Sequence, residues 1–249
     1  MVLIDGDIIV YRACYSGTSL EDCINTADDI LHEVAESVQF NLDMSRVEVF
    51  LTGHNPPNFR KAIAKTAPYK GHRSTTRPDY FYEIREYLEL TYDAKVSEGQ
   101  EADDDIATRA TQLGVGNCVI CSIDKDFRQI PGRFYNWGTG EEEIISEKDA
   151  LKNFYTQVLT GDSADNIKGA WMVGPKGADK LLKGCSTEEE LYEATLQGYQ
   201  GDLEALLENA QLVYLRREPN ETWRPPNDTI DKEPDIQENH SQPTTVPDS

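Results

Sequence analysis

Apolar residues along the first half of the chain recur with periods that predict alternating strands and helices. Residues 2–4 and 47–51 are short apolar runs, which are typical of buried strands. Residues 8–15 and 31–42 carry apolar side chains at helical spacing. We expect a sharp turn at Gly6, because glycine lacks the Cβ that restricts the backbone. The order strand, helix, strand predicts the start of a parallel sheet.

The same periods continue until the composition changes near residue 219. Helical spacing and further apolar runs predict helices at 80–90, 108–113, 148–159, 188–196 and 202–216, and strands at 94–96, 118–121, 134–137 and 143–145. From residue 219 onward Pro, Asn, Asp and Glu dominate, which predicts disorder. We therefore expect an α/β core over residues 1–145, with a central, mainly parallel sheet flanked by helices. A helical region over 146–217 and an acidic tail over 218–249 would follow.

Acidic residues gather where predicted elements begin and end. The acidic run at residues 101–105 precedes a helix, while Asp124 and Asp126 follow the strand at 118–121. In an open α/β sheet, chemistry is placed at the carboxyl ends of the strands. Carboxylates gathered there repel one another unless a cation compensates them, and hard divalent cations prefer such oxygen ligands. The alternative interpretation is structural, since acids favour the first turn of any helix and aspartates are common in turns.

Composition narrows the class of protein. The 249 residues suit one large domain, or a main domain with a smaller one. No apolar run approaches membrane-spanning length, no signal peptide precedes the first strand, and the five cysteines form no metal-ligand framework. We therefore expect a cytoplasmic protein with reduced thiols, in which Cys118 and Cys121 face opposite sides of a strand. The net charge of −21 argues against a nucleic-acid partner, but part of it lies in the acidic clusters and the tail.

Residues 54–85 differ from their surroundings because cations and aromatic rings are interleaved there. Basic residues neutralise phosphates and aromatic rings stack on unpaired bases, so this stretch predicts nucleic-acid binding. A solvated helix-loop-helix insertion is the alternative interpretation. The cations of the stretch are Arg60, Lys61, Lys65, Lys70, Arg73, Arg77 and Arg85.

A second candidate binding segment follows the helix at 148–159. Asp162 and Asp165 are three residues apart, which on a helical turn would place both carboxylates on one face. In residues 173–182 glycines surround a turn that opens a helix, which leaves backbone N–H groups free to hold a phosphate. The candidate residues of this turn are Gly174, Lys176, Gly177 and Lys180.

Taken in order, these motifs resemble the flap endonuclease and 5′→3′ exonuclease family, in particular its compact bacteriophage members. The resemblance covers five separated motifs between residue 2 and about residue 182. It implies a PIN-like α/β fold and two divalent metal ions, Mg²⁺ or Mn²⁺. The metal ligands that it implies are Asp5, Glu101, Asp103, Asp104, Asp124, Asp126, Asp162 and Asp165.

The resemblance also implies how the substrate is held. Residues 69–73 resemble the Tyr-Lys-Gly-x-Arg segment at the base of a helical arch, where Lys70 and Arg73 would act on the scissile phosphate and Tyr69 would stack on a terminal base. Residues 167–182 resemble the helix–three-turn–helix that grips duplex DNA, with a K⁺ ion as a bridge. The implied nucleic-acid contacts are Arg60, Lys61, Tyr69, Lys70, Arg73, Arg77, Gly174, Lys176, Gly177 and Lys180.

The partners implied by the resemblance are DNA with a free 5′ end, a nick or a 5′ flap, and RNA–DNA hybrid, with no membrane. The chain would act as a monomer, in the host cytoplasm if it is phage-encoded, and its acidic tail would contact replication proteins. Two other functions stay open. A PIN-type single-stranded ribonuclease shares the acidic pocket but usually lacks the second half of this chain. A non-catalytic DNA-structure-binding protein would not need the full set of acids.

Three features depart from the family pattern. Thr52 stands where many relatives carry an aspartate at the end of the second strand. Trp171 and Met172 replace a Pro-Gly pair in the hairpin before Val173, and the arch region over 71–80 is short. Two additional acids, Asp7 and Asp105, have no role in the pattern.

Overall fold

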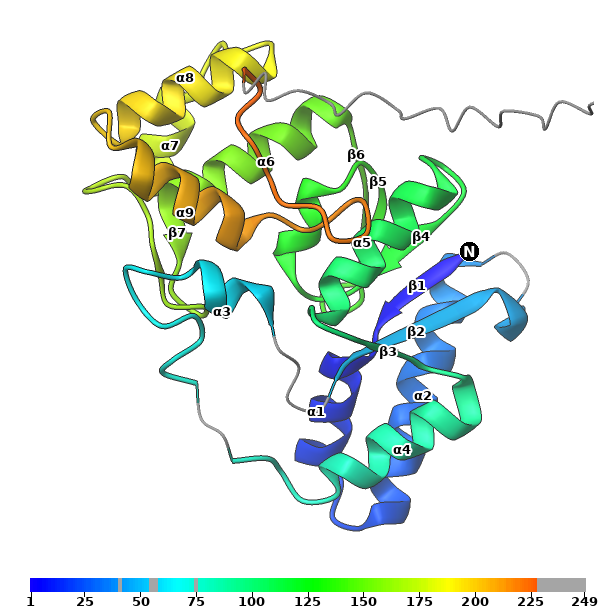
Figure 1. Ribbon diagram of the computed structural model, residues 1–249. Helices are drawn as coiled ribbons and strands as arrows, with labels where there is room; N and C mark the ends of the chain where they lie inside the picture. The colour runs from blue at the N-terminus through cyan, green and yellow to red at the C-terminus, as the bar shows by residue number, and fades with distance from the viewer. Residues whose placement is uncertain (40–41, 54–57, 74–75, 228–249) are drawn as a thin grey trace, which may run out of the picture.

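The computed structural model describes residues 1–39, 42–53, 58–73 and 76–227. Its centre is a six-stranded sheet in the order β3-β2-β1-β4-β5-β6 (Figure 1). All pairs are parallel except β5 with β6, which confirms the predicted mainly parallel α/β sheet. The strands are β1 (Val2–Asp5), β2 (Val47–Thr52), β3 (Lys95–Ser97), β4 (Val119–Cys121), β5 (Gly132–Asn136) and β6 (Glu141–Ile145).

Helices cover both faces of the sheet, which explains why every residue of β1 and β4 is buried. On one face lie α1 (Gly6–Ser16), α2 (Leu20–Val38) and α4 (Phe81–Tyr92), which share a buried core with Ile4 and Leu51. On the other face, α5 (Ala102–Leu113) packs against Leu3 and Phe50. Cys121 lies in the first core and Cys118 in the second, so the two free thiols face opposite sides as expected.

A second group of helices has its own core beside the sheet. It consists of α6 (Glu147–Thr160), α7 (Pro175–Leu181), α8 (Glu188–Gly198) and α9 (Leu203–Val213), with a small ladder of β7 (Gly161–Asp162) and β8 (Ile167–Lys168). Short helices α3 (Phe59–Ile63), η1 (Met44–Arg46) and η2 (Lys125–Gln129) complete the described fold. Among the described residues, none of the helices combines the length and apolarity needed to cross a bilayer.

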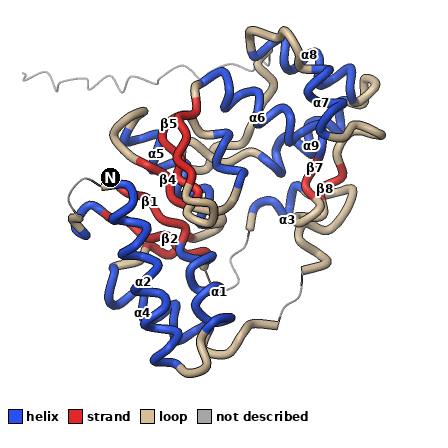
Figure 2. The backbone as a smooth tube through the Cα atoms, turned by 180° about the vertical axis from the view of Figure 1, so that it is seen from behind, coloured by secondary structure: helices blue, strands red, loops and turns tan. Residues whose placement is uncertain are grey.

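The basic stretch does not belong to the sheet part alone. Helix α3 contacts α9, and Tyr69 lies in the core of the helical group. Figure 2 shows α3 beside β7, β8 and α9, away from α1 and α4. The two ends of the predicted 54–85 region therefore attach to different parts of the molecule, because α4 packs against α1 and the sheet. Residues 54–57 and 74–75 of that region lie outside the described residues.

Gly6 has a different role from the expected turn. Helix α1 begins at Gly6 itself, directly after β1, and the residue is not among those with positive φ. A Cβ at this position would lie 2.8 Å from the carbonyl oxygen of Phe50 and 2.8 Å from a methyl carbon of Val49. Glycine is therefore required for the close approach of the first turn of α1 to β2, rather than for backbone freedom.

Two predicted boundaries differ from the structure. The helix expected over 31–42 ends at Val38, and Leu42 is exposed, so the apolar period ran past the end of the element. The acidic tail was expected from residue 218, but Trp223 is buried against rings of Phe154 and Tyr155. The packed part of the chain therefore extends beyond 218, while residues 228–249 of the expected tail lie outside the described residues.

Candidate metal centre

Three acids lie at the carboxyl edge of the parallel strands. Asp5 is the last residue of β1, and Asp124 and Asp126 follow β4 at the start of a short 3₁₀ helix. The hydroxyl of Ser122, which is fully buried, donates to Asp5 Oδ2 at 2.9 Å and accepts from the backbone N–H of Asp124 at 3.0 Å. Ser122 thus fixes Asp5 relative to the neighbouring strand, a role that the sequence prediction did not assign.

Glu101 and Asp103 reach the same edge from the N-terminus of α5. Glu101 is the N-cap of this helix and takes part in a capping box with Asp104, which favours helix initiation at this point. The hydroxyl of Thr52 accepts from the N–H of Ala102 at 2.9 Å. Thr52 occupies the position where many relatives were expected to carry an aspartate. Here its side chain connects the end of β2 to the start of α5.

Asp162 and Asp165 approach from the helical group. Asp162 lies in β7, and its carboxylate accepts from the N–H groups of Ala164 and Asp165 at 2.6 and 3.3 Å. The two acids therefore lie in a turn that closes the β7–β8 ladder rather than on the helical turn that was expected. Their side chains have separate partners, since Asp165 is held by Tyr69 and Arg73.

The carboxyl groups from these elements lie close enough to perturb one another's protonation. Burial raises the pKa of Asp5 to about 7, with the charges of Asp7 and Asp124 adding to the shift. Burial also raises the pKa of Asp126 to about 7, again with Asp124 contributing. For Asp103, burial and the charges of Asp5 and Asp124 raise the pKa well above its ordinary value. Such mutual repulsion is expected where several carboxyl groups lie close together without enough positive charge to compensate them.

Two basic side chains face this acidic pocket. The ammonium of Lys70 lies 2.5 Å from Glu101 Oε1 and 3.6 Å from Asp165 Oδ2. Burial alone would lower the pKa of Lys70, but Glu101 and Asp165 raise it, so the group stays charged. Arg73 pairs with Asp165 and donates from Nε to the carbonyl of Ala164. The structure thus brings both predicted phosphate-contacting residues to the acids.

Asp104 and Arg60 form a buried pair, a placement that differs from what was expected for both residues. Both Asp104 oxygens accept from the guanidinium of Arg60, at 2.6 and 2.8 Å, and the two side chains are 0% and 2% exposed. Arg60 also donates to the carbonyls of Leu212 and Tyr214. Asp104 thus compensates a buried cation at a position where a metal ligand was expected, and Arg60 joins α3 to α5 and the end of α9 at a position where a nucleic-acid contact was expected.

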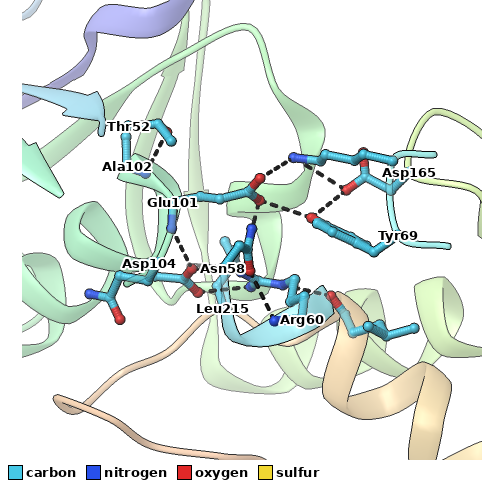
Figure 3. A network of polar contacts seen from close by, with 12 residues as sticks. Thr52, Asn58, Arg60, Tyr69, Glu101, Ala102, Asp104, Asp165 and Leu215 are labelled. Atoms are coloured by element: carbon cyan, nitrogen blue, oxygen red, sulfur yellow. Dashed lines mark hydrogen bonds and ion pairs between the residues drawn. The ribbon is translucent and has the colours of Figure 1, made fainter. Parts of the chain in front are cut away.

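Tyr69 is also placed differently from the expectation. Its ring is buried in the core of the helical group, so it presents no face for a base to stack on. Its hydroxyl lies 2.9 Å from Glu101 Oε2 and 2.8 Å from Asp165 Oδ2, which bridges the two acids (Figure 3). Tyr69 thus positions carboxylates from two parts of the fold. The sequence showed the residue type but not the burial of the ring.

The remaining predicted nucleic-acid contacts are accessible but lie apart. Lys61 is exposed on α3, and Arg77 is exposed near α1, where it bonds the hydroxyl of Tyr11 and lies over the Phe81 ring. The remaining four predicted contacts lie in the turn before α7 and in α7 itself. A Cβ added to either of the two glycines among them would meet no atom closer than 3.4 Å. These four are Gly174, Lys176, Gly177 and Lys180.

The two additional acids have partners of their own. Asp7 accepts from the N–H of Thr52 at 3.0 Å and pairs with Arg85 at 2.8 Å. Arg85 is buried, so this basic residue of the 54–85 stretch also holds the fold together. Asp105 accepts from the side-chain amide of Gln100. Burial leaves the pKa of Asp7 raised even with Arg85 beside it.

The donor set fits hard divalent cations. Carboxyl oxygens predominate in the pocket, and burial together with neighbouring negative charge raises the pKa values of Asp5, Asp103 and Asp126. Within the described residues, no group of three or more carboxylate, histidine or cysteine side chains is arranged to hold one metal ion. The ammonium of Lys70 lies within ion-pair distance of both Glu101 and Asp165. Mg²⁺ keeps several waters and needs few direct ligands, so an open arrangement is compatible with it.

The mainly parallel sheet carries this acidic pocket at its carboxyl edge, faced by Lys70 and Arg73, as expected for a 5′→3′ exonuclease. Residues 1–155 match the family described as "5'-3' exonuclease, N-terminal resolvase-like domain". The chain belongs to this 5′-3′ exonuclease family.

Two relatives by sequence and one solved structure illustrate what the chain is similar to. A 5'-3' exonuclease of Mycoplasmopsis pulmonis is 26% identical over 208 residues, which cover 78% of this chain and 69% of that protein. The flap endonuclease Xni of Shewanella woodyi is 33% identical over 126 residues, which cover 46% of this chain and 50% of that protein. The structure of the T5 D15 protein, co-crystallised with metal ions, has a TM-score of 0.68 at 18% identity and covers 86% of this chain and 89% of its own. This last likeness supports the fold.

Proposed function

We propose that this chain hydrolyses DNA from a free 5′ end, a nick or a 5′ flap, with two divalent ions, Mg²⁺ or Mn²⁺, held by the acidic pocket. The observation that carries the proposal is the convergence of acids from β1, β4, α5 and the β7–β8 turn on a pocket that also receives Lys70. Seven carboxyl groups remain after Asp104 is removed from the set: Asp5, Glu101, Asp103, Asp124, Asp126, Asp162 and Asp165.

The chain's own residues would divide the work as follows. Bound divalent ions would supply an ionised water and stabilise the departing oxygen of the phosphodiester. Asp5, Glu101 and Asp103 would hold the first ion, and the other four acids would hold or orient the second, partly through water. Ser122 and Tyr69 would keep these carboxylates in place through the hydrogen bonds described above.

Lys70 and Arg73 would contact the scissile phosphate. Fixed cations lower the energy of the charge that develops on a transferring phosphoryl group. The backbone of Lys70 is held beside the pocket, because its N–H donates to the carbonyl of Asp165 at 2.9 Å. The α7 region, with Lys176 and Lys180, would hold the duplex at a distance from the cut and so set the direction of cleavage. A K⁺ ion at that turn belongs to the same proposal, as do RNA–DNA hybrid as a substrate and the monomeric state.

Digestion of end-labelled substrates with Mg²⁺ tests the proposal. Blunt duplex, nicked duplex, 5′ flap, RNA–DNA hybrid and plain single-stranded RNA are compared for the wild-type chain and for Asp103→Asn, Asp124→Asn and the exposed control Asp29→Asn on α2. We expect cleavage of the duplex substrates at the 5′ end, loss of cleavage in the first two variants, and retained binding to DNA ends in Ca²⁺ or EDTA.

The possible outcomes separate the alternatives. Full activity of Asp103→Asn or Asp124→Asn would contradict the assigned pocket. Cleavage restricted to single-stranded RNA would favour a PIN-type ribonuclease. Binding of DNA ends without cleavage by the wild-type chain would indicate a non-catalytic DNA-structure-binding protein.

A further inference from the structure

Two large apolar side chains project from a tight turn before α7. The N–H of Val173 donates to the carbonyl of Ala170 at 3.1 Å, which closes a turn with Trp171 and Met172 at its apex. Trp171 is 78% exposed and Met172 is 86% exposed, whereas Ala170 is buried. Single apolar residues on a surface are ordinary, but here two of the larger side chains lie adjacent at a projecting position.

The backbone of this turn is fixed from below. Ala170 donates to the carbonyl of Leu159 at 2.8 Å and packs in the core of the helical group. Gly169 is so close to Leu159 and Thr160 that a Cβ on it would lie 2.3 Å from their backbone atoms. The apex is therefore presented by a rigid base, and little conformational entropy would be lost when it contacts a partner.

Met172 adopts a backbone conformation that glycine would adopt more easily. Its φ is 58°, in the left-handed region, which is uncommon for a residue with a side chain. The side chain recovers little by packing inside the chain, because most of it is exposed to solvent. The exposed side chain of Met172 is therefore available for contact with another molecule.

The surroundings of the apex are positively charged in an otherwise acidic protein. Residues 166–184 contain four lysines and one aspartate, whereas the whole chain has a net charge of −21. Lys168, Lys176 and Lys180 are exposed, and within the described ranges they take part in none of the ion pairs. Lys176 and Lys180 lie four residues apart in α7, so they share one face of that helix.

We propose that Trp171 and Met172 form an apolar wedge that inserts into the minor groove of duplex DNA while the lysines bind the flanking phosphates. This inference rests on the proposed function, and it assigns a contact to the two residues that depart from the family pattern. Apolar side chains inserted from the minor groove unstack base steps without reading the sequence. The local positive charge complements the phosphates of a polyanion, whereas association of two copies of the chain is opposed by the repulsion between their net charges of −21.

Salt dependence distinguishes a wedge from a purely electrostatic contact. The fully folded chain is titrated in Ca²⁺ with a fluorescently labelled nicked duplex at several salt concentrations. We compare the wild-type chain, the double variant Trp171→Ala/Met172→Gly, and the matched control Lys176→Ala/Lys180→Ala. The wedge variant should bind about tenfold more weakly with an unchanged slope of log affinity against log salt, whereas each lysine lost should reduce the slope by about 1.

The double variant should remain folded, because both residues are exposed and glycine suits the positive φ at position 172. The emission of Trp171, taken as the difference between the wild-type chain and Trp171→Phe, should be quenched by duplex but little affected by single-stranded DNA. Equal affinity of the double variant at every salt concentration, or a loss confined to the slope, overturns the wedge. A self-association of the wild-type chain that the double variant abolishes, with duplex binding intact, also overturns it.

Failure of the proposed function has a different signature in the same experiment. A wild-type chain that binds no duplex at low salt and cleaves none in Mg²⁺ contradicts the nuclease proposal itself. A wild-type chain that binds and cleaves, alongside a double variant with identical affinity, contradicts the wedge alone.

Discussion

The ammonium of Lys70 lies 2.5 Å from Oε1 of Glu101, and its backbone and side chain both face the turn that carries Asp165. The chain thus places one of its own cations between carboxylates from α5 and from the β7–β8 turn. Burial alone would raise the pKa of Glu101, but Lys70 and Arg60 hold it below its ordinary value. Lys70 therefore serves as a counter-ion for Glu101 and Asp165, and the proposed function gives it a second role at the scissile phosphate.

This dual placement predicts how Lys70→Met behaves. We expect single-turnover cleavage to fall by about 100-fold, because a fixed cation at the phosphate is lost. Affinity for Mn²⁺ should be unchanged or tighter, because Glu101 no longer has a competing ammonium beside it. Rapid-quench cleavage and calorimetric titration of Mn²⁺ measure the two effects.

Lys148→Met provides the control for Lys70→Met, because Lys148 is an exposed cation in α6 and is not among the predicted nucleic-acid contacts. It should leave single-turnover cleavage nearly unchanged. If Lys70→Met cleaves at the wild-type rate, Lys70 has no part in the chemical step.

The Arg60–Asp104 pair predicts a stability effect rather than a metal effect. Asp104→Asn leaves the guanidinium of Arg60 buried without a counter-charge, and breaking such a pair costs about 3–5 kcal/mol. Urea unfolding should show this loss, while Mn²⁺ affinity at low temperature should stay near that of the wild-type chain. Lys95→Met removes the half-exposed partner of Glu48 and should change stability by less than about 1 kcal/mol. An Asp104→Asn variant that is stable but has lost Mn²⁺ binding would show Asp104 to be a ligand.

The sequence predicted the edge of the sheet at which the acids meet, because the rule behind that prediction depends only on strand direction. Asp5 and Asp124 follow adjacent parallel strands, so their proximity is a consequence of topology. The sequence did not show that Asp103 and Asp104 have different surroundings. Both are aspartates in the first turn of α5, and the burial of one of them depends on Arg60, which is 44 residues away in the chain.

The sequence also could not distinguish basic residues that hold the fold from those that face a ligand. Arg60 and Arg85 belong to the same basic stretch as Lys70 and Arg73, and nothing in local spacing separates them. Their roles are decided by partners on distant elements, Asp104 for Arg60 and Asp7 for Arg85. The residues that orient the acids, such as Ser122, have equally ordinary local sequences.

The raised pKa values of Asp5 and Asp126 predict a pH dependence of the metal-free protein. Both pKa values are about 7 in the folded chain, above the ordinary value of 3.8, so between pH 4 and 7 the folded state binds more protons than the unfolded state. Stability contributed by these protons is present at low pH and is lost as pH rises through 7. The melting temperature measured in EDTA should therefore fall from pH 5.5 to pH 8.

Mg²⁺ should reverse this trend, because divalent ions compensate the carboxylates once the protons have left. About 10 mM Mg²⁺ should be enough to load a weak site. The rise in melting temperature that it causes should be larger at pH 8 than at pH 5.5. Asp5→Asn should reduce that difference. An equal Mg²⁺ effect at both pH values would show that the carboxyls are already ionised at pH 5.5.

The burial of Trp223 predicts where the packed chain can be shortened. Trp223 is 5% exposed and contacts the rings of Phe154, Tyr155 and Tyr192, and replacing such a side chain by alanine costs about 3–5 kcal/mol. Nearby, Glu221 accepts from the hydroxyl of Tyr214 at 3.0 Å. A chain ending at residue 227 should unfold at the wild-type urea concentration, since the composition of 228–249 predicts no core. A chain ending at residue 217 should lose at least as much stability as Trp223→Ala, and equal midpoints for the two truncated chains would show that this segment adds nothing to the fold.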